Sequence, residues 1–185
     1  MKQAIRDQRE QEILAAALAE LNVKEAPQIS MSSLASRTGL TRTAIYQYFA
    51  SVDDIFAELV INDMADLVNT LETQVSQLDQ PTERVRAWVH CSLEHLSSGE
   101  HAIIRRLSEI NLASEKRGIV RALHGQFMDS LNMAMKELEL ENAQTLSAHI
   151  AAVVNSAANR IDMGFDFAYE AQSAEAFVMN AIEQK

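Results

Sequence analysis

Glycine and proline are scarce in this sequence, with five Gly and two Pro among 185 residues. Together they make up about 4% of the chain, against roughly 12% in average proteins. Because hairpins and β-sandwiches need turn residues about every 8–12 positions, this scarcity excludes a fold built from short strands. It favours long helices, and we predict an all-α protein.

Cysteine and long hydrophobic runs are also missing. Cys91 is the only cysteine, so the chain has no internal disulfide and no CxxC motif for structural zinc. No segment reaches the roughly 18 consecutive apolar residues of a membrane span. The N-terminal segment carries too many charges for a signal peptide. These absences predict a cytoplasmic protein without a membrane partner.

Basic residues are outnumbered by acidic ones, 16 to 26, which gives a formal net charge of −10. Since Lys and Arg drive phosphate binding, this total argues against nucleic acid as a partner. However, residues 1–50 hold six basic and five acidic side chains, a net of +1, so the remainder carries −11. Residues 51–80 contain seven acids and no base. This run predicts a solvated acidic face or, as an alternative, steering of a cationic ligand.

Apolar spacing and capping residues predict nine helices. Ser30 and Thr41 are placed to cap two very short helices, and Pro81 suits the first turn of a later one. The last two helices are amphipathic, so they can form half of a four-helix bundle between two subunits, with packing inside one monomer as the alternative. The apolar stripes lie at about residues 14–21, 34–35, 45–49, 55–78, 85–96, 103–110, 120–138, 146–161 and 174–182.

The segment from Ser30 to Phe49 has the plan of a helix-turn-helix. Gly39 suits the left-handed backbone of a tight turn. The small core that fixes the crossing angle is expected to consist of Leu34, Ala35, Leu40 and Ile45. The side chains left outside are Arg42, Thr43, Gln47 and, in part, Tyr46 and Tyr48. Arg pairs with guanine or phosphate, Gln with adenine, Thr with a thymine methyl group and Tyr with phosphate, so this face suits DNA.

Residues 9–56 resemble the DNA-binding domain of the TetR family of bacterial transcription regulators. The residues that carry the resemblance are Ile13-Leu14-Ala15-Ala16-Ala17-Leu18, Leu34-Ala35, Thr38-Gly39-Leu40-Thr41-Arg42, Ile45-Tyr46, Tyr48-Phe49, Ser51 and Ile55. The resemblance implies a nine-helix, all-α homodimer. It also implies a DNA-binding domain at 1–52, whose helix-turn-helix motif spans about 31–49, and a ligand-binding and dimerisation domain at 53–185.

The resemblance further implies a function and a set of site residues. The expected protein is a repressor that binds a palindromic operator, is released by a small molecule and dimerises through about residues 143–183. Ser30 and Thr41 would cap the two motif helices, Arg42 and Thr43 would open the recognition helix, and Tyr46 and Tyr48 would anchor on the DNA backbone. Gln47 is the candidate base reader. The expected ligand site is lined by Trp88, Cys91, His95, Phe127, Met128 and Asn155.

Two positions depart from the family pattern. Val52 stands where the family usually has Lys, and Glu25 stands where it has Gly. One lost phosphate contact weakens binding to all DNA sequences together. The alternative function is therefore a TetR-like protein that has lost specific DNA binding and acts through a protein partner.

Metal and catalytic sites find little support in the sequence. Cys91 and His95 lie four apart with His90 adjacent, but no further ligand pair has compatible spacing, and His101, His124 and His149 are scattered. A di-iron helical enzyme needs Glu-x-x-His pairs, and the sequence has none. We predict no metal, no cofactor and no enzymatic activity.

Overall fold

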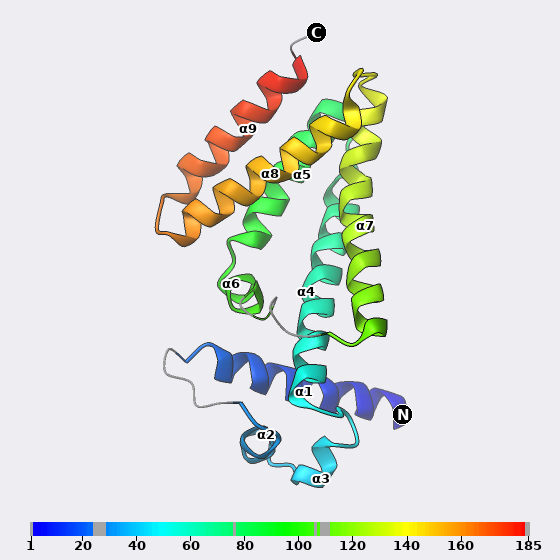
Figure 1. Cartoon of the computed structure of the whole chain (residues 1–185), viewed down its shortest axis with the longest axis vertical. Coiled ribbons are helices and arrows are strands. Elements are labelled where there is room, and N and C mark those ends of the chain that lie inside the picture. Colours follow the sequence, from blue (N-terminus) through cyan, green and yellow to red (C-terminus); the bar gives the residue numbers. More distant parts are fainter. Residues whose placement is uncertain (1, 24–28, 76, 106, 108–111, 184–185) are drawn as a thin grey trace. The chain divides into compact units, whose positions relative to one another are not determined.

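The computed structural model describes residues 2–23, 29–75, 77–105, 107 and 112–183. Within these residues the chain forms nine helices and no strand, which confirms the all-α prediction. None of the described helices has the length and apolar character needed to cross a membrane. The helices are α1 (Lys2–Leu21), α2 (Met31–Thr38), α3 (Arg42–Ile45), α4 (Val52–Val75), α5 (Pro81–Leu96), α6 (Gly99–Arg105), α7 (Ser114–Glu137), α8 (Ala143–Asp162) and α9 (Phe167–Glu183) (Figure 1).

The chain divides into two compact units. Unit 1 consists of Met1–Asn62 and Ile103–Gly118, and unit 2 consists of Asp63–Ala102 and Ile119–Lys185, as far as these residues are described. Each unit has its own cluster of buried apolar side chains. The predicted functional division after residue 52 falls at the start of α4 and stays a prediction.

The core of unit 1 joins the first three helices to the start of α4. α2 packs against both α1 and α3. Ile13 of α1, Leu34 of α2, Ile45 of α3 and Ile55 of α4 are all fully buried in this core. Because each helix contributes at least one of these side chains, burial of apolar surface holds the short α2 and α3 in place.

The core of unit 2 joins buried side chains from α4, α5, α7, α8 and α9. α5 packs against both α8 and α9, and Figure 1 shows α8 and α9 lying side by side as an antiparallel pair. Trp88 of α5 is fully buried, its indole N–H donates to the carbonyl oxygen of Phe127 at 3.1 Å, and the two rings have centroids 4.7 Å apart. Burial of the only tryptophan is therefore accompanied by a hydrogen bond for its polar atom.

Local signals set most helix ends. Pro81 occupies the first turn of α5, as predicted. Ser51 Oγ accepts from the N–H of Asp54 at 3.1 Å, and the Asp54 carboxylate accepts from the N–H of Ala50 at 3.2 Å, so these side chains cap the start of α4. One prediction needs correction, because α4 ends at Val75 and its stripe does not continue to residue 78 as helix. The predicted stripe residue Ile110 lies outside the described residues.

Candidate nucleic-acid interface and ligand site

The helix-turn-helix begins with a capped α2 and turns at Gly39. Ser30 Oγ accepts from the N–H of Ser33 at 3.1 Å, and Ser33 Oγ accepts from the N–H of Ser30 at 3.0 Å, which is a capping box made of two serines. Gly39 has a φ of 68° and ends α2, with its N–H and that of Leu40 both directed to the carbonyl of Ala35. This left-handed residue turns the chain sharply into α3.

α3 is a single helical turn fixed by its cap. Thr41 Oγ1 accepts from the N–H of Ala44 at 3.1 Å. Beyond Ile45 the chain continues through tight turns, in which the N–H of Tyr48 donates to the Ile45 carbonyl at 2.9 Å. Ile45 and Phe49 are both buried, which confirms that they form the inner side of this segment.

The opposite side of α3 presents the predicted DNA-contacting residues. Arg42, Thr43, Tyr46 and Gln47 are exposed, and Tyr48 is half-buried against the unit 1 core. The Arg42 guanidinium donates to the Tyr46 hydroxyl at 3.2 Å and lies 5.6 Å from the centre of its ring. The structure thus brings the predicted set together on one surface, while their roles toward DNA stay predictions.

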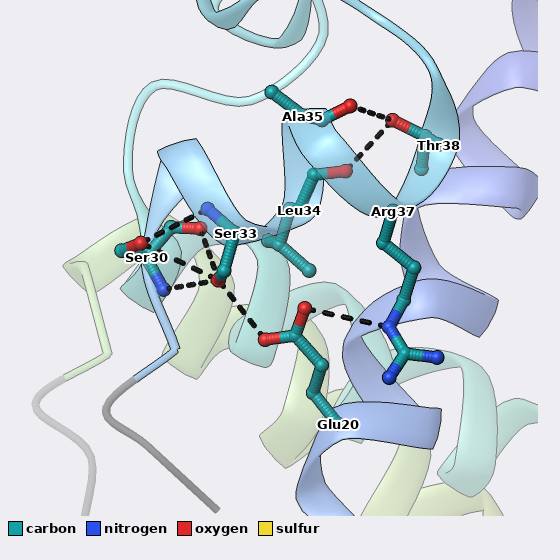
Figure 2. A network of polar contacts seen from close by, with 7 residues as sticks. All are labelled: Glu20, Ser30, Ser33, Leu34, Ala35, Arg37 and Thr38. Atoms are coloured by element: carbon teal, nitrogen blue, oxygen red, sulfur yellow. Dashed lines mark hydrogen bonds and ion pairs between the residues drawn. The ribbon is translucent and has the colours of Figure 1, made fainter.

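An acidic residue that the sequence reasoning missed links α1 to α2. Figure 2 shows the Glu20 carboxylate between Ser33 and Arg37. Ser33 Oγ donates to Glu20 Oε2 at 3.0 Å, and Arg37 Nε lies 3.5 Å from Glu20 Oε1, while the Glu20 side chain is only 12% exposed. No sequence pattern identifies this partner, because Glu20 precedes Ser33 by 13 positions and lies in a different helix.

The two departures from the family pattern have different outcomes. Val52 is half-buried and packs against the unit 1 core, so it contributes an apolar contact where a Lys would offer a cation. Glu25 lies outside the described residues.

Most of the predicted ligand-site residues belong to the unit 2 core. Trp88, Cys91 and Phe127 are buried there, and Met128 packs against the same cluster. The Cys91 thiol donates to Gln74 Oε1 at 2.7 Å. Burial, together with the charge of Glu94, raises the pKa of Cys91, so the thiol stays protonated at neutral pH.

Two members of the predicted ligand set, Asn155 and His95, do not belong to the buried apolar cluster of unit 2. Asn155 is exposed and its amide donates to the Ala151 carbonyl of its own helix at 3.0 Å, so its place in a ligand site stays a prediction. His95 Nε2 lies 3.1 Å from Asp63 Oδ1, and His101 Nδ1 lies 2.8 Å from the other oxygen of the same carboxylate. Sequence reasoning treated His101 as scattered and did not consider Asp63.

A capped helix-turn-helix with an exposed polar and aromatic face, in an all-α chain, is the architecture of helix-turn-helix DNA-binding proteins. Residues 13–59 match the family model described as bacterial regulatory proteins, tetR family. Residues 13–59 of this chain therefore match the TetR family model, in agreement with the sequence resemblance. A search of curated protein sequences gives no match.

Solved structures share the fold over nearly the whole chain. PfmR, a TetR-family transcriptional regulator from Thermus thermophilus, is 19% identical with a TM-score of 0.73, and the match covers 91% of this chain and 97% of that one. A TetR/AcrR-family regulator from Thermobifida fusca is 18% identical with a TM-score of 0.77, covering 94% and 97%. The regulator FadR from Bacillus subtilis, in complex with stearoyl-CoA, is 17% identical with a TM-score of 0.73, covering 91% and 97%. The chain therefore shares the fold of these TetR-family structures.

Proposed function

We propose that this protein is a homodimeric repressor that binds a pseudo-palindromic DNA operator and is released from it by a small molecule. The observation that carries the proposal is the exposed face of α3. There Arg42, Thr43 and Gln47 stand outward beside Tyr46, on a helix-turn-helix fixed by two caps and by the left-handed Gly39.

The chemistry of this face fits the major groove of DNA. Arg42 offers paired donors for guanine or phosphate, and Gln47 offers the donor and acceptor that adenine requires. Residues 26–50 include two arginines and no acid, so phosphate does not meet a negative side chain of this segment. In a dimer, two copies of α3 would enter successive major grooves about 34–36 Å apart.

The exposed faces of α8 and α9 support dimerisation. Before Arg160, α8 carries no Lys, Arg, Asp or Glu, although charged residues make up 23% of the chain. Tyr169 and Phe177 of α9 are 66% and 63% exposed, and a groove between the two helices is lined by small residues that include Ser156 and Ser173. Small side chains and exposed aromatic rings, beside the Arg160–Glu170 ion pair that also lines this groove, suit a second copy of the same helix pair.

A small-molecule effector is supported by the apolar core of unit 2 and by one structural relative. FadR from Bacillus subtilis was solved with stearoyl-CoA. In the present chain we place the effector beside Trp88, Phe127 and Met128, where an apolar group would find aromatic and flexible partners. The effector would favour a dimer conformation whose recognition helices no longer match the operator spacing.

The decisive experiment selects fragments of genomic DNA with the purified protein and then measures affinity for the selected operator. Arg42→Ala should weaken specific binding about 10–100-fold, because a base or phosphate contact is lost. Arg121→Ala is the matched control, since it removes one exposed arginine from α7 in unit 2. Full affinity of Arg42→Ala would overturn the role assigned to this residue.

A second candidate function is favoured by Val52, which removes a cation at the start of α4. In this case the protein acts through a protein partner and has no operator. Failure to retain any genomic fragment at low salt, with the dimer intact in size-exclusion chromatography, would support this alternative over the repressor.

A further inference from the structure

Three side chains with metal-binding atoms meet in unit 2. They are Asp63 of α4, His95 in the last turn of α5 and His101 in the first turn of α6. One oxygen or ring nitrogen from each lies within 4.8 Å of the other two. The side chains of Asp63, His95 and His101 are 7%, 18% and 11% exposed, so water only partly reaches the group.

The turn between α5 and α6 brings the two histidines together. α5 ends at Leu96, and Ser98 Oγ accepts from the backbone N–H of His101 at 3.1 Å as α6 begins. The chain therefore turns between the two residues, and their rings lie with centroids 5.3 Å apart and a tilt of 58°. Asp63 approaches both rings from a helix that is more than 30 residues away along the chain.

The polar contacts within this cluster are incomplete. His101 Nδ1 shares a hydrogen bond with Asp63 Oδ2 at 2.8 Å. His95 Nε2 lies 3.1 Å from Asp63 Oδ1 as an ion-pair contact, and this buried nitrogen has no hydrogen-bond partner among the described residues. A buried polar atom without a partner is costly, and a ligand that binds this nitrogen removes the cost.

The charge of the cluster suits a cation. Burial raises the pKa of Asp63, but the close contacts and charge of His101 and His95 outweigh it and bring the pKa to about 2. The carboxylate is therefore ionised at neutral pH. An ionised carboxylate between two imidazoles supplies the nitrogen and oxygen donors that first-row transition metals use in proteins.

We propose that Asp63, His95 and His101 bind one divalent transition-metal ion of the zinc class. Donors about 2.1 Å from a shared ion lie about 3.0–3.4 Å apart, close to the 2.8 Å and 3.1 Å contacts of the two histidines with Asp63. Rotation of the imidazole rings brings the remaining pair into range. Two imidazoles favour zinc-class ions over Mg²⁺ and Ca²⁺, which prefer oxygen donors. Three protein ligands leave one coordination position for water or an added ligand.

Cobalt(II) provides a direct probe, because it substitutes for zinc and gives visible absorption that reports its ligands. The full chain is stripped with a chelator, dialysed and titrated with Co²⁺, and Zn²⁺ binding is measured by calorimetry. We expect one ion per chain and a rise in the melting temperature with Zn²⁺. His95→Gln and His101→Gln should each weaken binding at least 10-fold, and the double variant should bind none.

Exposed histidines provide the matched controls. His90 and His124 are exposed residues of the same unit, so His90→Gln and His124→Gln should bind Co²⁺ as the wild type does. Circular dichroism checks that each variant keeps its helices. No uptake of either ion by the wild type, or equal uptake by the His95→Gln/His101→Gln variant, would overturn the proposal and assign the cluster to structural ion pairing. The measurement contains no DNA, so its outcome is independent of operator binding.

Discussion

Gly39 offers a clean test of how the helix-turn-helix is held, because the effect of its backbone conformation can be measured without a steric effect from its surroundings. Its φ of 68° lies in the left-handed region, and a Cβ placed on it would meet no atom within 4 Å. Gly39→Ala therefore adds a methyl group without a clash, and its whole cost comes from the backbone. For an L-residue this cost is about 1–2 kcal/mol.

Gly125 is the matched control in the other unit. It lies inside α7, a Cβ would again meet nothing within 4 Å, and its φ is not positive. Alanine exceeds glycine in helix propensity by about 0.8–1.0 kcal/mol in a helix interior. The same substitution should therefore destabilise unit 1 at Gly39 and stabilise unit 2 at Gly125.

Chemical denaturation at fixed protein concentration measures both effects. Far-UV circular dichroism follows the helices of both units, and fluorescence of Trp88, the only tryptophan, follows the core of unit 2. Gly39→Asn should recover part of the loss, because Asn tolerates the left-handed region better than Ala. A neutral or stabilising Gly39→Ala, or the same sign at both glycines, would refute the reasoning.

Three further predictions concern other contacts. Glu20→Ala should destabilise unit 1 by about 1–3 kcal/mol in urea denaturation, because it removes a charged acceptor. Glu20→Gln should destabilise it less, since glutamine keeps an oxygen for Ser33. Unchanged stability of Glu20→Ala would contradict the link between α1 and α2. Phe177→Glu should convert the proposed dimer to a monomer in size-exclusion chromatography. Met133→Glu, which changes a residue of α7 that is 62% exposed, should leave the dimer intact. A Phe177→Glu variant that stays dimeric would place the interface elsewhere. Burial and, to a smaller extent, the charge of Glu94 raise the pKa of Cys91. The thiol of the native protein should therefore react with a disulfide reagent at neutral pH far more slowly than the thiol of the denatured protein. Rapid labelling of the native protein would show that Cys91 is accessible.

The features that sequence predicts well here are local ones. Ser30 and Thr41 cap α2 and α3, Pro81 opens α5, and Gly39 closes α2, each within a few residues of its partner. A cap or a left-handed turn depends on atoms that the chain itself brings close, so a short stretch of sequence contains the whole interaction. The candidate DNA-contacting face follows from the same logic, because the side opposite Ile45 is fixed once the helix is placed.

The features that sequence missed depend on angles between helices. His95 and His101 meet because the chain turns between α5 and α6, and a shift of that turn would separate their rings. The exposure of Asn155 has a related cause. The buried side of α8 runs through Ile150, Val154 and Ala157, which leaves Asn155 exposed, and the sequence alone does not say which small residues of an Ala-rich helix face inward.

Residues 51–80 contain acidic side chains and no basic one, so their ion pairs are made with residues from other parts of the chain. No base lies within that segment, so any of its carboxylates that becomes buried must find a positive or hydrogen-bonding partner in another helix. Within unit 1, Asp54 and Glu58 both contact Lys116 of α7. Within unit 2, Asp63 is held by His95 and His101. Of these three residues only Asp63 has a buried side chain, so the prediction of a solvated acidic face does not hold there, whereas Asp54 and Glu58 stay partly exposed. The alternative, attraction of a cation, agrees with the metal site proposed at Asp63, because its partners there are imidazoles, which can themselves bind a metal ion.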